Sequence, residues 1–245
     1  MKRLLFIITV LTLSISAMVI GKTSTPALKW LGHACFVVTS AEGKKLVIDP
    51  FSKLGYPSPE VSANVVLVSH NHFDHSTVDT IKDNPEVIRG LNSDGDWNDV
   101  DQTVAGFHIK SFACYHDSKS GVVRGKNTIF LIEVDGLRLV HLGDLGHVLN
   151  DKTARAIGRV DVLMIPVGGY FTIGPDEAWK VVDQLAPRVI VPMHYKTPVV
   201  GKLPIGPVDD FTAKRAKASM RQLKSNTATL VLPKSQQVWI FSLPK

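Results

Sequence analysis

The feature that most constrains this chain is a cluster of metal-binding side chains directly after an apolar run. Residues 65–68 read Val-Val-Leu-Val, and His70, His72, Asp74 and His75 follow at once. A short aliphatic run that stops at a polar segment is typical of a buried strand that delivers a loop to the edge of a sheet. Imidazole and carboxylate groups suit zinc and similar divalent ions. The spacing therefore predicts two metals, one facing His70 and His72 and the other facing Asp74 and His75.

The pattern His-x-His-x-Asp-His after an apolar strand resembles the metallo-β-lactamase superfamily, and further matching residues follow in the expected order. His116, in Phe-Ala-Cys-Tyr-His-Asp, resembles the third histidine of the first metal. Asp144, in His-Leu-Gly-Asp, resembles the bridging aspartate, and His194, in Val-Pro-Met-His-Tyr, resembles the last histidine. The resemblance runs from about residue 28 to residue 231. It implies an α/β (α+β) fold, an αββα sandwich of four layers.

The same resemblance implies the roles of the ligands. One ion would be held by three histidines and the other by Asp74 with two histidines, with Asp144 bridging them; the assignments are His70, His72 and His116, then Asp74, His75 and His194. Zinc is the expected metal, and manganese or iron would suit the same ligands. Two cations lower the pKa of a shared water towards about 7, so a bridging hydroxide would attack a carbonyl or phosphorus centre. Asp74 would orient the nucleophile or accept its proton.

Further segments resemble one branch of the superfamily. Gly32-His33-Ala34, Asp49-Pro50 and residues 166–170 and 192–195 are similar to metal-dependent hydrolases that include ascorbate-6-phosphate lactonase. We therefore expect cleavage of an ester, lactone or phosphodiester in a small molecule. One alternative is a secreted metallo-β-lactamase, in which a bridging aspartate is not expected. Another is a non-catalytic metal-binding or sensing module, although a structural zinc site usually closes with four ligands.

Four residues outside the ligand set are candidates for binding substrate. His33 lies in the Gly-His pair, and a hydrogen-bonded histidine at a strand end is the alternative. His147 follows Asp144 on a glycine-rich turn, where a histidine at a helix end is equally compatible. Arg124 would supply guanidinium donors for an anion, unless it simply occupies a hairpin turn. Tyr195 adjoins His194, where its phenol would either bind substrate or pack.

The first residues indicate export. Met1-Lys2-Arg3 precedes a largely apolar stretch that ends in small residues, the pattern of a secretory signal over residues 1–21. Cleavage is expected after Ser16 or Gly21, and residues 22–245 are expected to form a single hydrolase domain in the periplasm or the medium. Contact with a membrane is expected only if the segment stays uncleaved as an anchor, for which it is near the lower length limit.

Composition narrows the classes of partner. The chain has 44% hydrophobic and 20% charged residues, which is ordinary for a globular protein, and a net charge of +6. That charge favours an anionic substrate, but no basic run with interleaved aromatic residues indicates nucleic acid. The basic residues at 214, 215, 217 and 221 are interpreted as the solvated face of a helix. Cys35 and Cys114 are expected as buried free thiols, with a disulfide as the alternative in an oxidising compartment.

Apolar runs and turn residues predict the elements. Strands are expected at residues 35–39, 45–48, 65–68, 107–114, 128–134, 137–142, 160–165, 189–191, 229–232 and 237–241. Helices are expected at residues 77–82, 152–157, 175–185 and 209–223.

Overall fold

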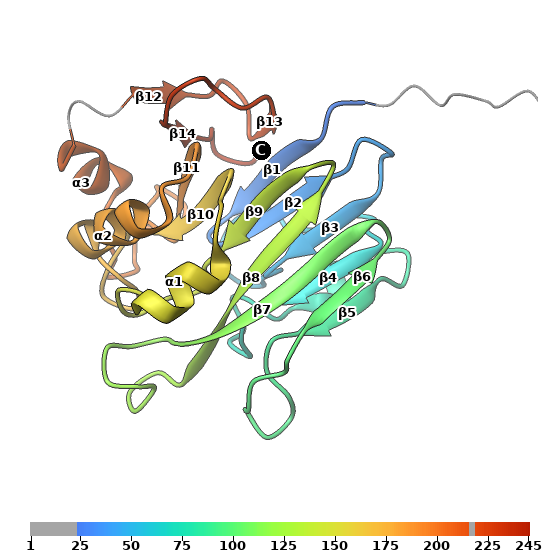
Figure 1. Ribbon diagram of the computed structural model, residues 1–245, viewed down its shortest axis with the longest axis horizontal. Coiled ribbons are helices and arrows are strands. Elements are labelled where there is room, and N and C mark those ends of the chain that lie inside the picture. The colour runs from blue at the N-terminus through green and yellow to red at the C-terminus, as the bar shows by residue number, and fades with distance from the viewer. Residues whose placement is uncertain (1–23, 216–218) are drawn as a thin grey trace, which may run out of the picture.

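The computed structural model describes residues 24–215 and 219–245, so the predicted signal segment lies outside the described residues. Two sheets pack face to face (Figure 1). The six-stranded sheet has the order β13-β1-β2-β3-β4-β5, formed by β1 (Ala27–Gly32), β2 (Cys35–Thr39), β3 (Lys45–Ile48), β4 (Val65–Val68), β5 (Glu86–Arg89) and β13 (Thr227–Thr229).

The larger sheet has eight strands in the order β12-β14-β11-β10-β9-β8-β7-β6. Its members are β6 (Asp101–Val104), β7 (Phe107–Tyr115), β8 (Lys126–Val134), β9 (Leu137–His141), β10 (Val162–Pro166), β11 (Val189–Met193), β12 (Ser219–Gln222) and β14 (Gln237–Ile240). Strands β6 to β9 run antiparallel, whereas β9, β10, β11, β14 and β12 run parallel. Parallel strands place their carboxyl ends along one edge, where loops gather side chains for chemistry.

Alternation along the strands explains why both faces of the smaller sheet are buried. In β2, Phe36 and Val38 belong to the core between the sheets, while Cys35 and Val37 pack on the opposite face. β3 and β4 alternate in the same way. Side chains in a strand point to opposite faces in turn, so an unbroken apolar run marks a strand that is covered on both sides.

The outer layers of the two sheets differ. The helices α1 (Asp151–Ile157), α2 (Pro175–Leu185) and α3 (Val208–Ala213) gather beside the larger sheet in Figure 1. In the described residues, the outer face of the smaller sheet is covered by loops and one 3₁₀ turn, η1 (Val78–Thr80), through residues such as Phe51, Tyr56 and Val200. The predicted two-sheet fold with flanking helices is confirmed. In the described residues, the α-helices lie beside the larger sheet, and loops with η1 form the layer outside the smaller sheet.

Helix α2 is defined locally and anchors α3. Pro175 starts the helix, the Glu177 carboxylate accepts a hydrogen bond from Gly174 N (2.8 Å), and Ala186 ends it in a left-handed conformation. Trp179 stacks on Phe211 of α3 with ring centroids 4.5 Å apart. The short α3 therefore depends on this tertiary contact for its place.

Two helix predictions were wrong in extent. Of residues 209–223, only the first few are helical: α3 ends at Ala213, residues 216–218 lie outside the description, and Ser219–Gln222 is the edge strand β12. Arg221 lies with its guanidinium carbon 4.9 Å from the Trp239 ring centroid on β14, instead of on a helix face. Of residues 77–82, only η1 is helical. The Thr77 hydroxyl hydrogen-bonds the carbonyl of Phe73, an interaction that competes with helix formation.

Four strands were missed and one was displaced. The missed strands are β1, β5, β6 and β12, and the strand expected at residues 229–232 is β13, which ends at Thr229. β6 and β12 lie at sheet edges, where few apolar residues are needed. The prediction of unbridged cysteines is confirmed, because Cys35 and Cys114 are both free and buried. No described helix combines the length and the apolar character needed to cross a bilayer.

Candidate metal centre

The candidate ligands come from the ends of strands in both sheets. β4 delivers the segment with His70 and its neighbours, while β7, β9 and β11 are followed by His116, Asp144 and His194. All of these strands end at the same edge of the sandwich, so residues far apart in sequence meet there. The structure thus brings together all seven positions that the sequence predicted as ligands.

In the described residues, potential ligand atoms form three groups, of which one joins Asp49 to His70 and His75 and the other two contain the remaining predicted histidines and Asp74. His70, His72 and His116 offer atoms that lie within 4.8 Å of one another, and so do Asp74, His75 and His194 together with His33. In the first group, His70 Nε2 and His72 Nδ1 are 3.1 Å apart. Each of these two groups could therefore hold a metal ion.

Asp144 lies between the two groups. Its Oδ2 is 3.1 Å from His116 Nε2 and 3.3 Å from His194 Nε2, and its Oδ1 is 3.2 Å from His75 Nε2. One carboxylate therefore contacts histidines of both groups, as a bridging ligand would.

The buried polar atoms around Asp144 would be better satisfied by metal ions than they are by one another. In the described structure, His75 Nε2 and Asp144 Oδ1 lie 3.2 Å apart, yet both are buried and neither makes a hydrogen bond. Buried polar atoms are normally paired, and leaving one unpaired costs about 1–3 kcal/mol. Ions at the two groups would satisfy both atoms.

Asp49 fixes the orientation of the histidine loop. Its fully buried carboxylate accepts hydrogen bonds from Ser69 N (2.8 Å), Ser69 Oγ (2.6 Å) and His75 Nδ1 (2.9 Å). Ser69 Oγ in turn contacts His70 Nδ1 at 2.9 Å. Holding the Nδ1 side of each ring directs Nε2 of His70 and His75 into the centre, as outer hydrogen bonds do at metal sites.

Two further ligands are oriented by neighbours. His116 Nδ1 donates to the carbonyl of Phe171 (3.1 Å), and His33 Nε2 hydrogen-bonds Asp74 Oδ2 (3.2 Å). His33 adopts a left-handed conformation with φ of 51°, and Trp30 Nε1 donates to its carbonyl. The sequence predicted His33 at the site, and the structure places it against Asp74.

The electrostatics favour positive charge at the centre. Burial lowers the pKa of His70 well below its ordinary value, and His75 lowers it further. Burial alone would lower the pKa of His75 and raise that of Asp144. Instead, Asp144 and Asp49 hold the pKa of His75 well above its ordinary value, and His194 and His75 hold the pKa of Asp144 well below its own. Bound cations would supply the charge that the buried carboxylates attract.

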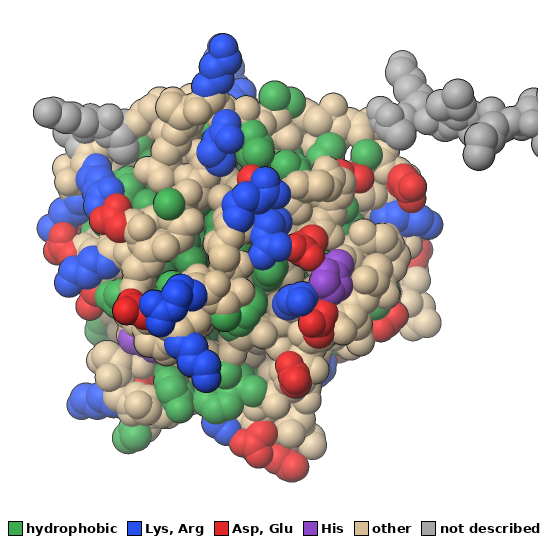
Figure 2. All heavy atoms as spheres, in the orientation of Figure 1, with side chains coloured by type: hydrophobic (Ala, Val, Ile, Leu, Met, Phe, Trp, Pro, Cys, Tyr) green, Lys and Arg blue, Asp and Glu red, His purple; other side chains and the backbone are tan. Residues whose placement is uncertain are grey.

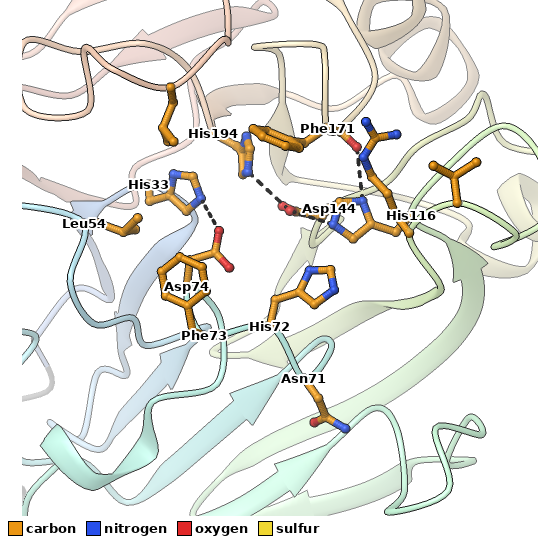
Figure 3. Close-up of a pocket in the computed structure, with 13 residues that line it drawn as sticks. His33, Leu54, Asn71, His72, Phe73, Asp74, His116, Asp144, Phe171 and His194 are labelled. Atoms are coloured by element: carbon orange, nitrogen blue, oxygen red, sulfur yellow. Dashed lines mark hydrogen bonds and ion pairs between the residues drawn. The ribbon is translucent and has the colours of Figure 1, made fainter.

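A cavity of about 560 Å³ opens over the centre. Figure 3 shows His72, Asp74, His116, Asp144 and His194 directed into a common space. Phe73 and Leu54 lie to one side of this space, and Phe171 borders it beside His194. A substrate entering the cavity would reach the ligand cluster directly.

The structure brings two of the other predicted substrate residues to this cavity, His33 and Arg124. It does not bring His147 there, because both ring nitrogens are engaged with backbone, at Tyr115 N (3.2 Å) and the carbonyl of Val148 (2.9 Å). Nor does Tyr195 line it: this side chain is buried and stacks on Trp30 at 5.6 Å between ring centroids. Adjacency in sequence to a ligand did not place either side chain in the cavity.

Three residues that help to orient the candidate ligands were given no role on the basis of the sequence. Asp49 was matched only as part of a segment that resembles related hydrolases, and neither Ser69 nor Phe171 was assigned a function. The available signal for Asp49 was a buried carboxylate position at the end of an apolar strand, since buried carboxylates need partners. The Phe171 contact uses a backbone carbonyl, which no side-chain pattern reveals.

Comparison with known proteins identifies the family. The model of the beta-lactamase superfamily domain matches residues 27–194. The chain belongs to this superfamily. A UPF0173 metal-dependent hydrolase of Thermococcus kodakarensis is 34% identical over 191 residues, which cover 69% of this chain and 84% of that protein. One from Archaeoglobus fulgidus is 30% identical over 200 residues, covering 71% and 86%.

Solved structures agree. A Thermotoga maritima protein, described as a candidate Zn-dependent hydrolase of the metallo-β-lactamase superfamily, is similar at a TM-score of 0.71 and 38% identity, covering 89% of this chain and 99% of that chain. A candidate metal-dependent hydrolase from Parabacteroides distasonis, at a TM-score of 0.62 and 17% identity over 89% and 93% of the two chains, shares the fold. The chain is thus a metal-dependent hydrolase of the metallo-β-lactamase superfamily.

Proposed function

We propose that the protein is a dinuclear hydrolase, with zinc as the expected metal, that cleaves an ester, lactone or phosphodiester bond in a small molecule. The observation that carries the proposal is the position of Asp144, within 3.3 Å of histidines from both ligand groups. The first ion would lie among His70, His72 and His116, and the second among Asp74, His75 and His194.

The residues of the chain have separable roles in this proposal. Bound ions would activate a water near pH 7 and polarise the scissile bond. Asp74, held by His33 and partly exposed to the cavity, is placed to orient that water or to accept its proton. Asp49 and the Phe171 carbonyl keep the histidine rings aimed, which limits reorganisation during the reaction.

The first experiment measures metal content by plasma mass spectrometry after zinc loading, together with hydrolysis of a lactone, a phosphodiester and a β-lactam. We expect close to two ions per chain and chelator-sensitive turnover on the lactone or the phosphodiester. A single tightly held ion without turnover would favour a structural or sensing role. Preference for the β-lactam would favour the β-lactamase alternative.

Asp144→Asn tests the bridge. We expect it to lower turnover by roughly 100-fold or more, because the substitution removes the charge shared by both groups. His108→Ala is the matched control: this histidine lies on β7, paired with Asp101 and Glu133, and should keep full metal content. Full metal loading with unchanged turnover in Asp144→Asn would contradict the proposed bridge.

We further propose that the enzyme is exported through residues 1–21, so that it acts in the periplasm or the medium. The support is the basic start followed by the apolar stretch. Sequencing the amino terminus of protein recovered from each cell fraction tests this. A cytoplasmic protein that still begins at Met1 would contradict it.

A further inference from the structure

The space over the metal centre has two lobes that meet at one arginine. A second cavity of about 360 Å³ adjoins the first, and the two share Asn71, His72 and Arg124 in their walls. Among the candidate ligands, Asp74, His116, Asp144 and His194 line the larger lobe, His70 lines the smaller one and His72 lines both. A substrate spanning the junction would therefore be held on both sides of its scissile bond.

Apart from the ligand cluster, His33, Asn71 and Arg124, the side chains that line the larger lobe are apolar. The non-ligand side chains include Leu54, Phe73, Val123, Phe171 and Leu203. Phe73 is 61% exposed and Val123 is 57% exposed, although both face the cavity. Large apolar groups gathered at a cavity mouth gain free energy when an apolar ligand covers them.

Two further exposed side chains neighbour residues that line this lobe: Tyr170 packs against Phe171 and Arg124, and Val122 precedes Val123 in the chain. Val122 and Tyr170 are 83% and 64% exposed. Figure 2 shows hydrophobic side chains gathered at the lower left of the molecule, over the loop between β7 and β8 that carries Val122 and Val123. The mouth therefore offers an apolar ligand more contact than the cavity alone.

Arg124 supplies a cation at the junction. Its guanidinium carbon lies 5.6 Å from the ring centroid of Phe171 and 5.8 Å from that of Tyr170. Among the ion pairs of the described residues, none involves Arg124, whereas Lys126, the other cation in the smaller lobe, is paired with Asp96. An arginine without a carboxylate, beside a lobe whose walls also include Asn71 and Ser120, is available to bind an anion.

The loop that carries Arg124 is held rigidly. The Asp117 carboxylate accepts four backbone hydrogen bonds, from Lys119 N (2.7 Å), Gly121 N (3.0 Å), Val123 N (3.0 Å) and Arg124 N (2.7 Å). A preformed loop presents its cation and its apolar side chain without paying the entropy of ordering on binding.

We propose that the substrate is an amphiphilic anion, with a phosphate or carboxylate group bound by Arg124 in the smaller lobe and an alkyl or acyl portion lying in the larger lobe against Phe73 and Phe171. This assignment rests on the proposed function, because it takes the metal centre as the point of cleavage. Its distinguishing consequence is that affinity depends on both the charge and the apolar length of a ligand.

The test measures equilibrium binding of inorganic, butyl, hexyl and octyl phosphate to the zinc-loaded protein by calorimetry, below the concentrations at which alkyl phosphates form micelles. We expect affinity to rise at least about twofold per methylene, since full burial of a methylene corresponds to roughly fourfold. Phe73→Ser should flatten this dependence. Val231→Ser, at a 64% exposed valine far from the site, should leave it unchanged.

Arg124→Met should weaken all of these ligands by roughly tenfold or more, the value typical of a hydrogen bond to a charged group. Arg155→Met is the control, because this 75% exposed arginine on α1 is remote from the cavities. Equal affinity for inorganic and octyl phosphate, or wild-type affinity in Arg124→Met, would overturn the proposal.

These binding results separate the two proposals. Binding that depends on alkyl length, without turnover of any substrate, would contradict the proposed hydrolase and support the amphiphilic ligand. Turnover that is independent of the charge and length of the substrate would support the hydrolase and contradict the amphiphilic ligand. Sedimentation with phosphatidylglycerol vesicles then identifies the source of the ligand. Binding to vesicles that Phe73→Ser abolishes indicates a membrane lipid, and binding only to dissolved alkyl phosphates indicates a soluble metabolite.

Discussion

Asp49 illustrates how much of the centre depends on one buried carboxylate outside the ligand set. It accepts hydrogen bonds from the backbone and hydroxyl of Ser69 and from the ring of His75. These hydrogen bonds fix the rotamers of two predicted ligands, His70 and His75. The orientation of the ligand rings is therefore a property of neighbouring side chains as well as of the ligands.

Asp49→Asn should weaken zinc affinity by roughly 10- to 100-fold, the cost typical of removing a partner of a metal ligand, while the protein stays folded. Competition with a chromophoric chelator measures the affinity, and circular dichroism checks the fold. Asp161→Asn is the control, since Asp161 is also buried but accepts a hydrogen bond from Arg138 N at the far end of β10. Equal zinc affinity in both variants would contradict the role assigned to Asp49.

His141 predicts the pH dependence of the metal-free protein. Its Nε2 donates to the carbonyl of Ala34 (2.8 Å) and its Nδ1 accepts from Gly143 N (3.1 Å), so the ring is held neutral. Burial, reinforced by His75, lowers the pKa of His141 from its ordinary value of 6.5. Below about pH 6.5 the His141 ring therefore takes up a proton in the unfolded chain but not in the folded chain. The free energy of unfolding consequently decreases as the pH is lowered.

The measurement is urea unfolding of chelator-treated protein between pH 7.5 and pH 5. One such group contributes at most about 1.4 kcal/mol per pH unit. His141→Gln keeps a donor but does not titrate, so its stability should fall less steeply over this range. If the free energy of unfolding of His141→Gln changed with pH as steeply as that of the wild type, His141 would titrate alike in the folded and unfolded states, which would contradict the prediction.

At the level of elements, the loops after β7 and β9 are locked together by close backbone packing. A Cβ built on Gly146 would lie 2.2 Å from Asp117 N and 2.3 Å from His116 C. Gly146 N also donates to the carbonyl of Tyr115 (2.9 Å). The loop that carries Asp144 and the loop that carries His116 can approach this closely only with glycine at the contact.

Gly146→Ala should therefore push the two loops apart. We expect a loss of roughly 1–3 kcal/mol in the free energy of unfolding, as for other overpacked sites, together with weaker zinc binding. Urea unfolding and metal titration measure the two effects. Gly201→Ala is the control, because its added Cβ would meet no atom closer than 3.6 Å. Wild-type behaviour of Gly146→Ala in both assays would contradict the packing argument.

The elements themselves divide into those set locally and those set by pairing. The long apolar runs of β4, β8 and β10 were predicted because both faces of each strand are buried and the sequence shows it. β12, which was expected to be helical, has four exposed residues and exists through its pairing with β14. Edge strands of this kind carry little local signal, since the partner strand supplies the stabilisation.

At the scale of the whole molecule, the metal centre joins the two sheets. His70, His72, Asp74 and His75 follow a strand of the smaller sheet, whereas His116, Asp144 and His194 follow strands of the larger one. Ions bound by both sets would cross-link the layers. An ion that binds the folded state but not the unfolded state raises the stability of the fold by mass action.

Metal removal should consequently lower the melting temperature. At zinc concentrations about 1,000 times the dissociation constant, binding adds about 4 kcal/mol, which for a chain of this size corresponds to roughly 10 °C. Thermal denaturation with and without chelator measures the difference. Asp144→Asn should show a smaller shift, and an identical melting temperature in zinc and in chelator would contradict a cross-linking centre.

The sequence by itself determined the chemistry of the centre. The His-x-His-x-Asp-His segment after an apolar strand, with His116, Asp144 and His194 further along, specified the ligand types, and the structure brings these seven side chains together. Strand-end position and ligand chemistry are local properties, so spacing along the chain records them. Resemblance to a known superfamily supplied the order and the roles.

Only the tertiary structure decided what surrounds the ligands. The hydrogen bonds of Asp49, the engagement of His147 with backbone, the burial of Tyr195 and the apolar lobe at Phe73 join residues from separate elements. Such contacts depend on the pairing of strands and the paths of loops, which are fixed by the packing of the entire chain. For that reason the convergence of the candidate ligands was predictable from motif spacing and family resemblance, whereas the shape of the cavity above them was not.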